Sequence, residues 1–357
     1  EQEDSCQWYF HNYSSSQWEL EWYSNIEKLQ NHICEILTQT SHSSKSIQLL
    51  QRVIDLNQNG YLPSTVAAAA DNLLSRMYYR QQCVSASGEK YIRLEAYQLI
   101  EPLIGLLRDP LTICTFTNDF IKLIPKDLYI HGDEALFSKR HLLLTPAAPY
   151  AVINQNNFPK AELPQLTQPW TYKRSQIDDS KIITNSPPQI ILLDLGSQYF
   201  GKSDAFTSTR WFYDYFKKRS MSFSRIIAYE ITSLEPTTVW DQVPDELMSA
   251  YTLINVGCSA DRTSKYNPWR LLLAIAKPED YVIVKLDIDT HAVEMPLIQQ
   301  ILENSTISHL IDEMFFEHHV TQTNMIKYWG HSPGSMKDSY QYFTKLRQTG
   351  IRMHAWP

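Results

Sequence analysis

Residues 189–196, Gln-Ile-Ile-Leu-Leu-Asp-Leu-Gly, decide the fold. A short apolar run that ends in an acid and a glycine is typical of a parallel strand buried on both faces that turns sharply at its end. Further strand-length segments are expected at residues 224–230, 251–256, 281–288, 309–319 and 351–356. Helices are expected between them, at residues 209–219, 295–303 and 337–349. This alternation predicts an α/β fold with a doubly wound, mostly parallel, Rossmann-like sheet.

The chain of 357 residues exceeds the usual size of one hydrophobic core, and its composition changes twice along its length. Apolar residues at helical spacing predict four early helices, at residues 22–38, 46–56, 64–79 and 89–107. Seven prolines between residues 144 and 188 favour extended, irregular chain. We therefore predict three parts: a mostly helical N-terminal region (1–143), an extended proline-rich connector (144–188) and the α/β domain (189–357).

The composition excludes two classes of partner. Hydrophobic residues make up 43% of the chain and charged residues 20%, which is typical of a protein that folds around a core. The net charge is −7 and the basic residues form no long run, so nothing predicts binding to the phosphate backbone of nucleic acid. No apolar run has the length needed to cross a bilayer, so no transmembrane segment is expected.

Cysteines and glycosylation motifs bear on the compartment. None of the five cysteines forms a Cys-X-X-Cys pair, which speaks against a zinc site. In an oxidising compartment, the four N-terminal cysteines could form one or two disulfides and leave Cys258 as the odd thiol. Residues 12–14 (Asn-Tyr-Ser) and 304–306 (Asn-Ser-Thr) are acceptor motifs for N-linked glycans. Together with a first residue, Glu1, that is not methionine, these features favour the secretory pathway or the cell exterior, with an organelle lumen as the alternative.

Ligands of a doubly wound sheet bind at the carboxyl ends of its strands. Asp194 and Gly196 close the first strand, where a glycine lets the backbone N–H groups, including that of Ser197, approach a ligand. Glu230 closes the second strand, where a carboxylate can accept hydrogen bonds from both hydroxyls of a ribose. The plain alternatives are an ordinary strand-to-helix turn and a solvated strand end. The order of these residues favours a nucleotide-type site.

Residues 281–289 form the third candidate. Strand alternation would place Lys285, Asp287 and Asp289 on one face. Three ionisable groups on a buried strand are costly unless they are paired or serve a site. A structural ion pair between lysine and aspartate is the simpler interpretation.

Residues 312–319 form the fourth candidate. If the segment stays extended, Glu317 and His319 share one face and His318 takes the other. A carboxylate beside an imidazole can form a base with its orienting partner, or can bind a divalent metal together with Asp287 or Asp289. These residues leave a metal-dependent hydrolase as the least favoured alternative. Neighbouring histidines at a strand end are also often plain surface residues.

The α/β part resembles the FkbM-like branch of SAM-dependent methyltransferases, and above all its divergent eukaryotic and algal members. Residues 193–196 (Leu-Asp-Leu-Gly) are similar to the family's first motif, and residues 225–230 (Arg-Ile-Ile-Ala-Tyr-Glu) to its second-strand acidic motif. Residues 284–289 (Val-Lys-Leu-Asp-Ile-Asp) resemble its third. The likeness covers about residues 189–357, roughly half of the chain.

This resemblance implies a methyltransferase sheet of mixed strand direction, with SAM as the cofactor across the ends of the first two strands. The adenosine ribose would meet Glu230, and the methionine part would lie over the turn at Asp194, Gly196 and Ser197. The family's acceptors are hydroxyl groups, often on sugars, which implies a glycan or a small hydroxylated acceptor. The implied catalytic residues are Asp287, Asp289, Glu317 and His319, with His319 or Asp289 as the base that takes the hydroxyl proton.

The chain departs from the family at its first and third motifs. Where the family usually has Gly-Ala-Asn-X-Gly, residues 197–200 are Ser-Gln-Tyr-Phe, and the third motif ends in Asp-Thr instead of Glu-Gly. The alternative function is therefore a catalytically inactive descendant that acts as a structural or interaction subunit with protein assembly partners, at the cell surface or outside the cell. In that case Gln198 or Tyr199 would occupy the cofactor space.

Overall fold

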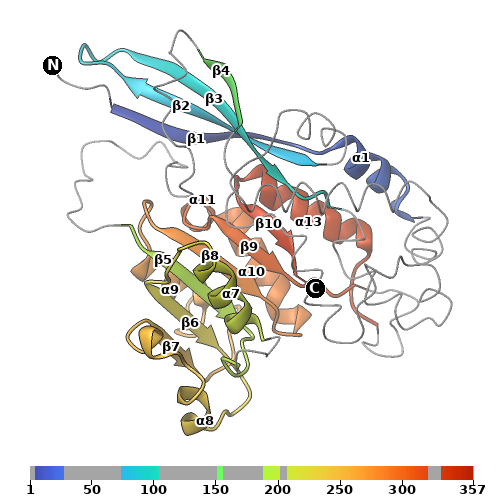
Figure 1. Ribbon diagram of the computed structural model, residues 1–357. Coiled ribbons are helices and arrows are strands. Elements are labelled where there is room, and N and C mark those ends of the chain that lie inside the picture. Colours follow the sequence, from blue (N-terminus) through green and yellow to red (C-terminus); the bar gives the residue numbers. More distant parts are fainter. Residues whose placement is uncertain are drawn as a thin grey trace, which may run out of the picture. The chain divides into compact units, whose positions relative to one another are not determined.

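A computed structural model describes residues 5–27, 74–103, 151–155, 188–201, 207–320 and 331–356. The chain divides into two compact units, each assembled from segments that are separate in sequence (Figure 1). The first unit comprises Glu1–Arg174, His319–Gly350 and Pro357, and the second comprises Ser175–His318 and Ile351–Trp356. The second unit thus begins before residue 189 and does not include residues 319–350.

The second unit holds one six-stranded sheet in which every pair of neighbouring strands is parallel. Its strands are β5 (Ile190–Leu195), β6 (Arg225–Tyr229), β7 (Tyr251–Ile254), β8 (Tyr281–Leu286), β9 (Glu313–Phe316) and β10 (Arg352–Ala355). The spatial order is β10-β9-β8-β5-β6-β7, so the strand order reverses between β5 and β8. The predicted α/β class and parallel, Rossmann-like sheet are confirmed. The mixed strand direction is wrong for the described strands.

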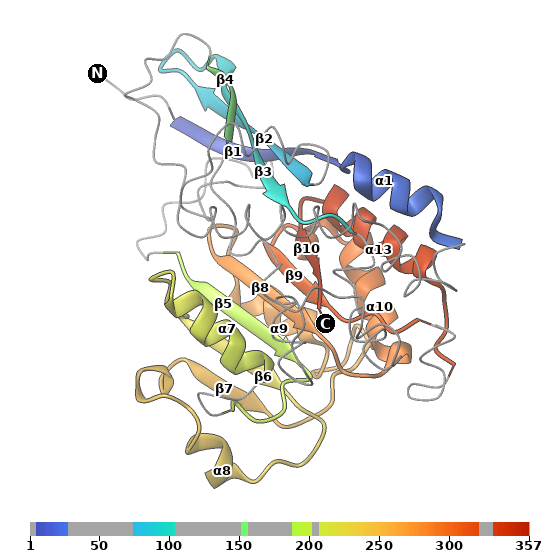
Figure 2. The same ribbon diagram turned by 45° about the vertical axis from the view of Figure 1, so that its right-hand side comes forward.

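Helices cover this sheet on both faces, with α7 on one and α9 and α10 on the other (Figures 1 and 2). The helical elements of the unit are α7 (Ser208–Lys217), α8 (Pro236–Trp240), the 3-10 turn η2 (Asp245–Leu247), α9 (Pro268–Ile275), α10 (His291–Glu303) and α11 (Ser305–Ser308). The prediction missed α9, although an asparagine cap and a proline at the first position mark its start. It also began α10 four residues late, because Pro296 lies inside the helix and not in its first turn.

Burial on both faces explains why the central strands could be recognised in the sequence. All six residues of β5 and all six of β8 are buried, as expected for strands covered on both faces. Aromatic side chains of α7 pack on the sheet, with Phe212 stacked on Trp356 at 5.3 Å between ring centroids and edge-on to Phe315 at 4.9 Å. The core of the unit is therefore a layer of apolar strands under an aromatic helix.

The first unit is built on an antiparallel sheet and not on helices. Its strands β1 (Ser5–Ser14), β2 (Ser75–Val84), β3 (Lys90–Ile100) and β4 (Ala151–Gln155) lie in that order. For the described residues the predicted N-terminal helical region is thus wrong: β2 takes up residues 75–79 of the helix expected at 64–79, and β3 takes up residues 90–100 of that expected at 89–107. The remainder of the first of these expected helices, residues 64–73, lies outside the described residues. The predicted helix at 46–56 lies outside the described residues, and that at 22–38 overlaps only the end of α1 (Gln17–Ser24).

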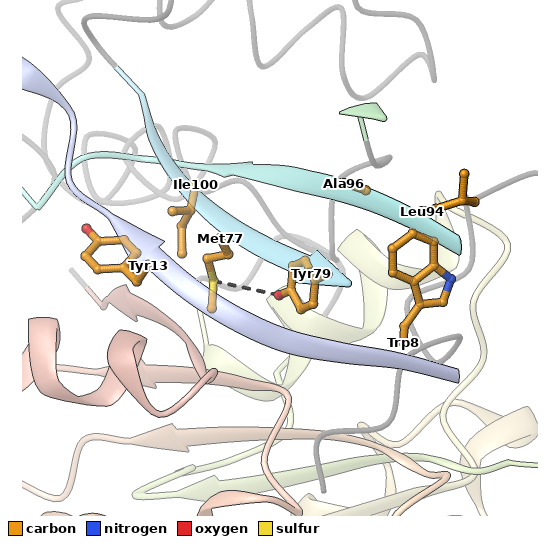
Figure 3. Packing of buried hydrophobic residues seen from close by; sticks show 7 residues of the cluster. All are labelled: Trp8, Tyr13, Met77, Tyr79, Leu94, Ala96 and Ile100. Atoms are coloured by element: carbon orange, nitrogen blue, oxygen red, sulfur yellow. Dashed lines mark hydrogen bonds between the residues drawn. The ribbon is translucent and has the colours of Figure 1, made fainter. Parts of the chain in front are cut away.

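The strands of this sheet share a compact apolar cluster. Every second residue of β2 is buried, the period of a strand with one face on a core. Figure 3 shows the cluster side chains, which come from the first three strands: Trp8, Tyr13, Met77, Tyr79, Leu94, Ala96 and Ile100. The alanine run at residues 67–70, on which the expected helix partly rested, lies outside the described residues.

A disulfide joins Cys6 on β1 to Cys83 on β2, which pair directly across the two strands. This confirms a disulfide within the N-terminal part of the chain. Cys258 is a free thiol. The remaining two cysteines, Cys34 and Cys114, lie outside the described residues.

The C-terminal helix α13 (Met336–Gln348) belongs to the first unit and is tied to it by a buried ion-pair group. Arg347, which is fully buried, donates to the Tyr13 hydroxyl at 3.0 Å and to the Glu101 carbonyl at 2.9 Å, and lies 3.6 Å from the Glu19 carboxylate. Glu19 is itself fully buried and accepts hydrogen bonds from Tyr13, Ser75, Leu103 and Tyr340. Residues more than 300 positions apart thus form one core.

In the described parts of the chain, no helix combines the length and apolar character that a membrane span needs.

Candidate functional site

The ends of β5 and β6 meet at one edge of the sheet. Leu195 pairs with Tyr229 in register, so Gly196 and Glu230 each lie one residue beyond a paired strand end. The N–H groups of Gly196 and Ser197 both donate to the carbonyl of Tyr229, at 2.9 and 3.1 Å. The structure therefore brings together the residues that the sequence proposed as a cofactor site.

Gly196 is required by a close approach of the chain itself. Its φ is +84°, and a Cβ atom at this position would lie 1.8 Å from the carbonyl oxygen of Asp287. Asp287 directly follows β8, the neighbour of β5 on its other side. The glycine therefore lets the turns after β5 and β8 pack backbone to backbone.

Glu230 holds the loops on both sides of the β6 end. Its carboxylate accepts a hydrogen bond from the Gln198 N–H at 3.0 Å and one from the Thr232 N–H at 2.6 Å. Its carbonyl accepts from the side-chain amide of Asn255 at 2.7 Å. The side chain is 7% exposed. Each carboxylate oxygen thus accepts one backbone N–H and keeps a second acceptor position.

Lys285 neutralises two aspartates beneath this edge. Its ammonium group lies 2.9 Å from Oδ2 of Asp287 and 3.6 Å from Oδ1 of Asp194, and donates to the Gly196 carbonyl at 2.7 Å. Burial acts to lower the pKa of Lys285, but the charges of Asp287 and Asp194 outweigh it and raise the pKa above the ordinary value. Lys285 is therefore charged, and the lysine–aspartate ion pair that the sequence left open is present.

Asp194 anchors the first turn of α7. Its side chain is fully buried, and Oδ2 accepts from the hydroxyls of Ser208 at 2.7 Å and Thr209 at 2.5 Å. Carboxylates near a helix N-terminus also interact favourably with the helix dipole. Asp194 thus links β5 to the start of α7 and to the buried Lys285.

The four proposed catalytic residues lie in different places. β8 ends at Leu286, and Asp289, at φ 54°, is exposed beyond it, so the strand alternation expected up to residue 289 is wrong. Glu317 directly follows β9, and its charge contributes to the raised pKa of Lys285. His319 falls in the first unit. Asp287 and Glu317 are therefore the pair that the structure brings together, around Lys285.

Two histidines that the sequence did not combine are stacked at the same edge. His291 begins α10, and its ring lies 5.9 Å from that of His318, at an interplanar angle of 20°. His318 is 6% exposed and also stacks on Phe316, so it is not a plain surface residue. Burial lowers the pKa of His291. The two residues are 27 positions apart, and only the pairing of β8 with β9 brings them together, so the sequence carried no local signal.

The bulky residues after Gly196 are held by the unit's own groups. Gln198, at φ 56°, has an exposed side chain, and its backbone rather than its side chain engages Glu230. The Tyr199 hydroxyl accepts from the Glu235 N–H at 3.2 Å, and Phe200 is fully buried.

The sequence analysis missed Asn255, whose side chain also donates to the Thr232 carbonyl. Its position just after the third strand of the sheet was the available signal.

Other chemistry has less support in the described ranges. No three His, Cys, Asp or Glu side chains there are grouped so as to hold a metal ion. Burial raises the pKa of the Cys258 thiol to about 12, so the thiol is protonated at neutral pH and is a poor nucleophile. An open hollow of about 670 Å³ lies between α7 and residues 241–245. Its lining includes the ion pair Arg210–Asp214, and Lys217, which forms an ion pair with Glu246.

Comparisons of the chain with protein-family models, with curated proteins and with solved structures found no match.

Proposed function

We propose that the second unit is a SAM-dependent O-methyltransferase whose cofactor binds at the carboxyl edge of β5 and β6, and whose acceptor is a glycan or small hydroxylated molecule. One observation carries the proposal: the Gly196–Ser197 turn and Glu230 lie side by side at the ends of adjacent parallel strands, next to the reversal of strand order. In doubly wound sheets, this is where nucleotide-like ligands bind.

Glu230 suits the ribose of such a cofactor. A carboxylate has about four acceptor positions, and the N–H groups of Gln198 and Thr232 use two of them. The two ribose hydroxyls can donate to the others. Since Glu230 is nearly buried, the chain at Gln198 must move aside when the cofactor enters.

The acceptor lies in this proposal over the ends of β8 and β9. When bound, SAM supplies an electrophilic methyl group. Asp287, which forms an ion pair with Lys285, accepts a hydrogen bond from the acceptor hydroxyl and orients it. Asp289, exposed beyond β8, takes the hydroxyl proton. The charge of Glu317 reinforces the anionic character of this edge.

Isothermal titration of the full chain with SAM tests the cofactor site. We expect saturable binding, and we expect Glu230→Gln to weaken it by about tenfold or more, since a lost charge-assisted hydrogen bond costs about 1.5–3 kcal/mol. Glu279→Gln is the matched control, because Glu279 lies just before the amino end of β8, whereas the proposed site lies at the carboxyl ends of the strands. Absence of heat at millimolar SAM contradicts the proposal.

A second candidate, a non-catalytic structural or interaction subunit, is favoured by a different observation. Three residues central to the edge already have partners within the unit: Gly196 packs on Asp287, Glu230 binds two backbone N–H groups, and Lys285 binds two aspartates. Hydrogen exchange separates the candidates. If SAM does not change the hydrogen exchange of the Gln198 and Thr232 amides, the result supports the structural subunit. If SAM changes their exchange, the result supports the cofactor site.

A further inference from the structure

The exposed part of β1 results from a β-bulge. Trp8 and Phe10 point toward the apolar cluster of the first unit, so a regular strand would place residue 12 on that same face. The pairing of β1 with β2 shifts between Phe10 and Asn12, which inserts His11 as an extra residue. Tyr13 therefore points inward and is 7% exposed, while Asn12 turns to the exposed side.

The bulge presents a complete glycan acceptor motif. Asn12 and Ser14, the first and third residues of the triplet, are both exposed, and Tyr13 between them anchors the strand in the core. The other triplet differs, because the side-chain oxygen of Asn304 caps α11 by accepting the Thr306 N–H at 3.0 Å. Asn304 is also only half-exposed. Of the two motifs, that at Asn12 is the more accessible.

A second feature of the same strand points to the compartment in which such glycans are added. The Cys6–Cys83 disulfide lies six residues before Asn12 and joins β1 to β2. Disulfides form and persist in oxidising compartments such as the lumen of the endoplasmic reticulum. Among the described strands β1 moreover lies at the edge of its sheet, and a bulky group on an edge strand hinders its pairing with other chains.

We infer that Asn12 carries an N-linked oligosaccharide. The donor is a lipid-pyrophosphate-linked oligosaccharide. The side-chain nitrogen of Asn12 forms a bond to the anomeric carbon of the sugar, the bond from that carbon to the pyrophosphate oxygen breaks, lipid pyrophosphate leaves, and the nitrogen loses one proton. Ser14 completes the acceptor motif. This inference is independent of the proposed methyltransferase activity.

Mass spectrometry of the full chain, directed into the secretory pathway of a eukaryotic cell, tests it. Enzymatic release of the glycan in H₂¹⁸O converts a glycosylated asparagine to ¹⁸O-labelled aspartate, so each motif is scored separately. We expect label at residue 12, and loss of that glycan in Asn12→Gln and Ser14→Ala but not in Ser14→Thr, which keeps the motif. Asn304→Gln serves as the matched control and should leave occupancy at Asn12 unchanged.

Both the secreted and the cell-associated protein are measured, and alkylation of free thiols shows whether Cys6 and Cys83 are joined. Because Asn12 and Ser14 are exposed, and Asn304 belongs to the unit that does not contain Cys6 and Cys83, the disulfide should form in every variant. Disulfide-bonded wild-type protein with an unmodified Asn12 overturns the inference, whether or not Asn304 carries a glycan.

Discussion

Gly196 is a glycine because of the backbone that faces it. The site for a Cβ atom is taken by the Asp287 carbonyl, and the φ angle of +84° disfavours any side chain. The same glycine would also suit the approach of a ligand, so its presence in the sequence could not distinguish the two reasons. The partners of Lys285 were likewise left open by the sequence, which places it near Asp287 and Asp289. In the structure its ion pairs are with Asp287 and Asp194.

We expect Gly196→Ala to destabilise the second unit far more than Gly88→Ala destabilises the first. Both glycines have a φ of +84°, so both alanines incur left-handed strain of about 1–3 kcal/mol. Only at Gly196 does the new Cβ collide with backbone, because Gly88 has nothing within 4 Å. Hydrogen exchange of the strands next to each glycine measures the two effects separately. Equal losses would show that the turns after β5 and β8 can separate without cost.

At the scale of elements, the bounds of α13 could be predicted from the sequence, but its packing partner could not. Its start is marked by a capping box between Ser335 and Asp338, which is a local signal, and the helix predicted at residues 337–349 is confirmed within one residue at each end. Its partner was not predictable. Tyr340 and Arg347 bind Glu19 and its neighbours, which lie at the other end of the chain.

We expect Arg347→Met to destabilise the first unit by about 3–5 kcal/mol, because it leaves the Glu19 and Glu101 carboxylates buried without their cation. Lys345→Met is the control: it removes an exposed charge from the same helix and should change stability by less than about 0.5 kcal/mol. Urea unfolding, followed by tyrosine and tryptophan fluorescence, compares the two variants. Similar midpoints would show that apolar packing alone holds α13.

At the scale of the whole molecule, the chain passes between the two units more than once. It leaves the first unit after Arg174, returns to it at His319, and adds β10 to the second with residues Ile351–Trp356. Neither unit is therefore a continuous stretch of sequence, and the division at residues 143 and 188 expected from composition does not coincide with the units. Composition reports local character, whereas the units are defined by contacts between distant segments.

A fragment of residues 1–174 should not fold, because it lacks α13 and leaves Glu19 buried without Arg347. Joining residues 319–350 to it through a flexible linker should restore folding, and the same fusion carrying Arg347→Met should not. Thiol alkylation after limited proteolysis shows whether the Cys6–Cys83 disulfide forms and is protected. A protected disulfide in the unfused fragment would contradict this account.

The sequence by itself determined the α/β half of this protein. Strands buried on both faces are apolar along most of their length, and glycine and acidic residues mark their ends, so β5, β6 and β8 and the meeting of Gly196 with Glu230 could be predicted. These signals are local and need no knowledge of the rest of the chain.

The tertiary structure alone decided the rest. The antiparallel sheet of the first unit, the stacking of His291 on His318, the bulge that exposes Asn12 and the burial of Arg347 against Glu19 all join segments far apart in sequence. Residues 75–79, expected to end a helix, belong instead to β2, whose pairing with β1 and β3 buries every second residue. Such pairings gain their free energy only when both partners are in place, so no single segment carries their signature.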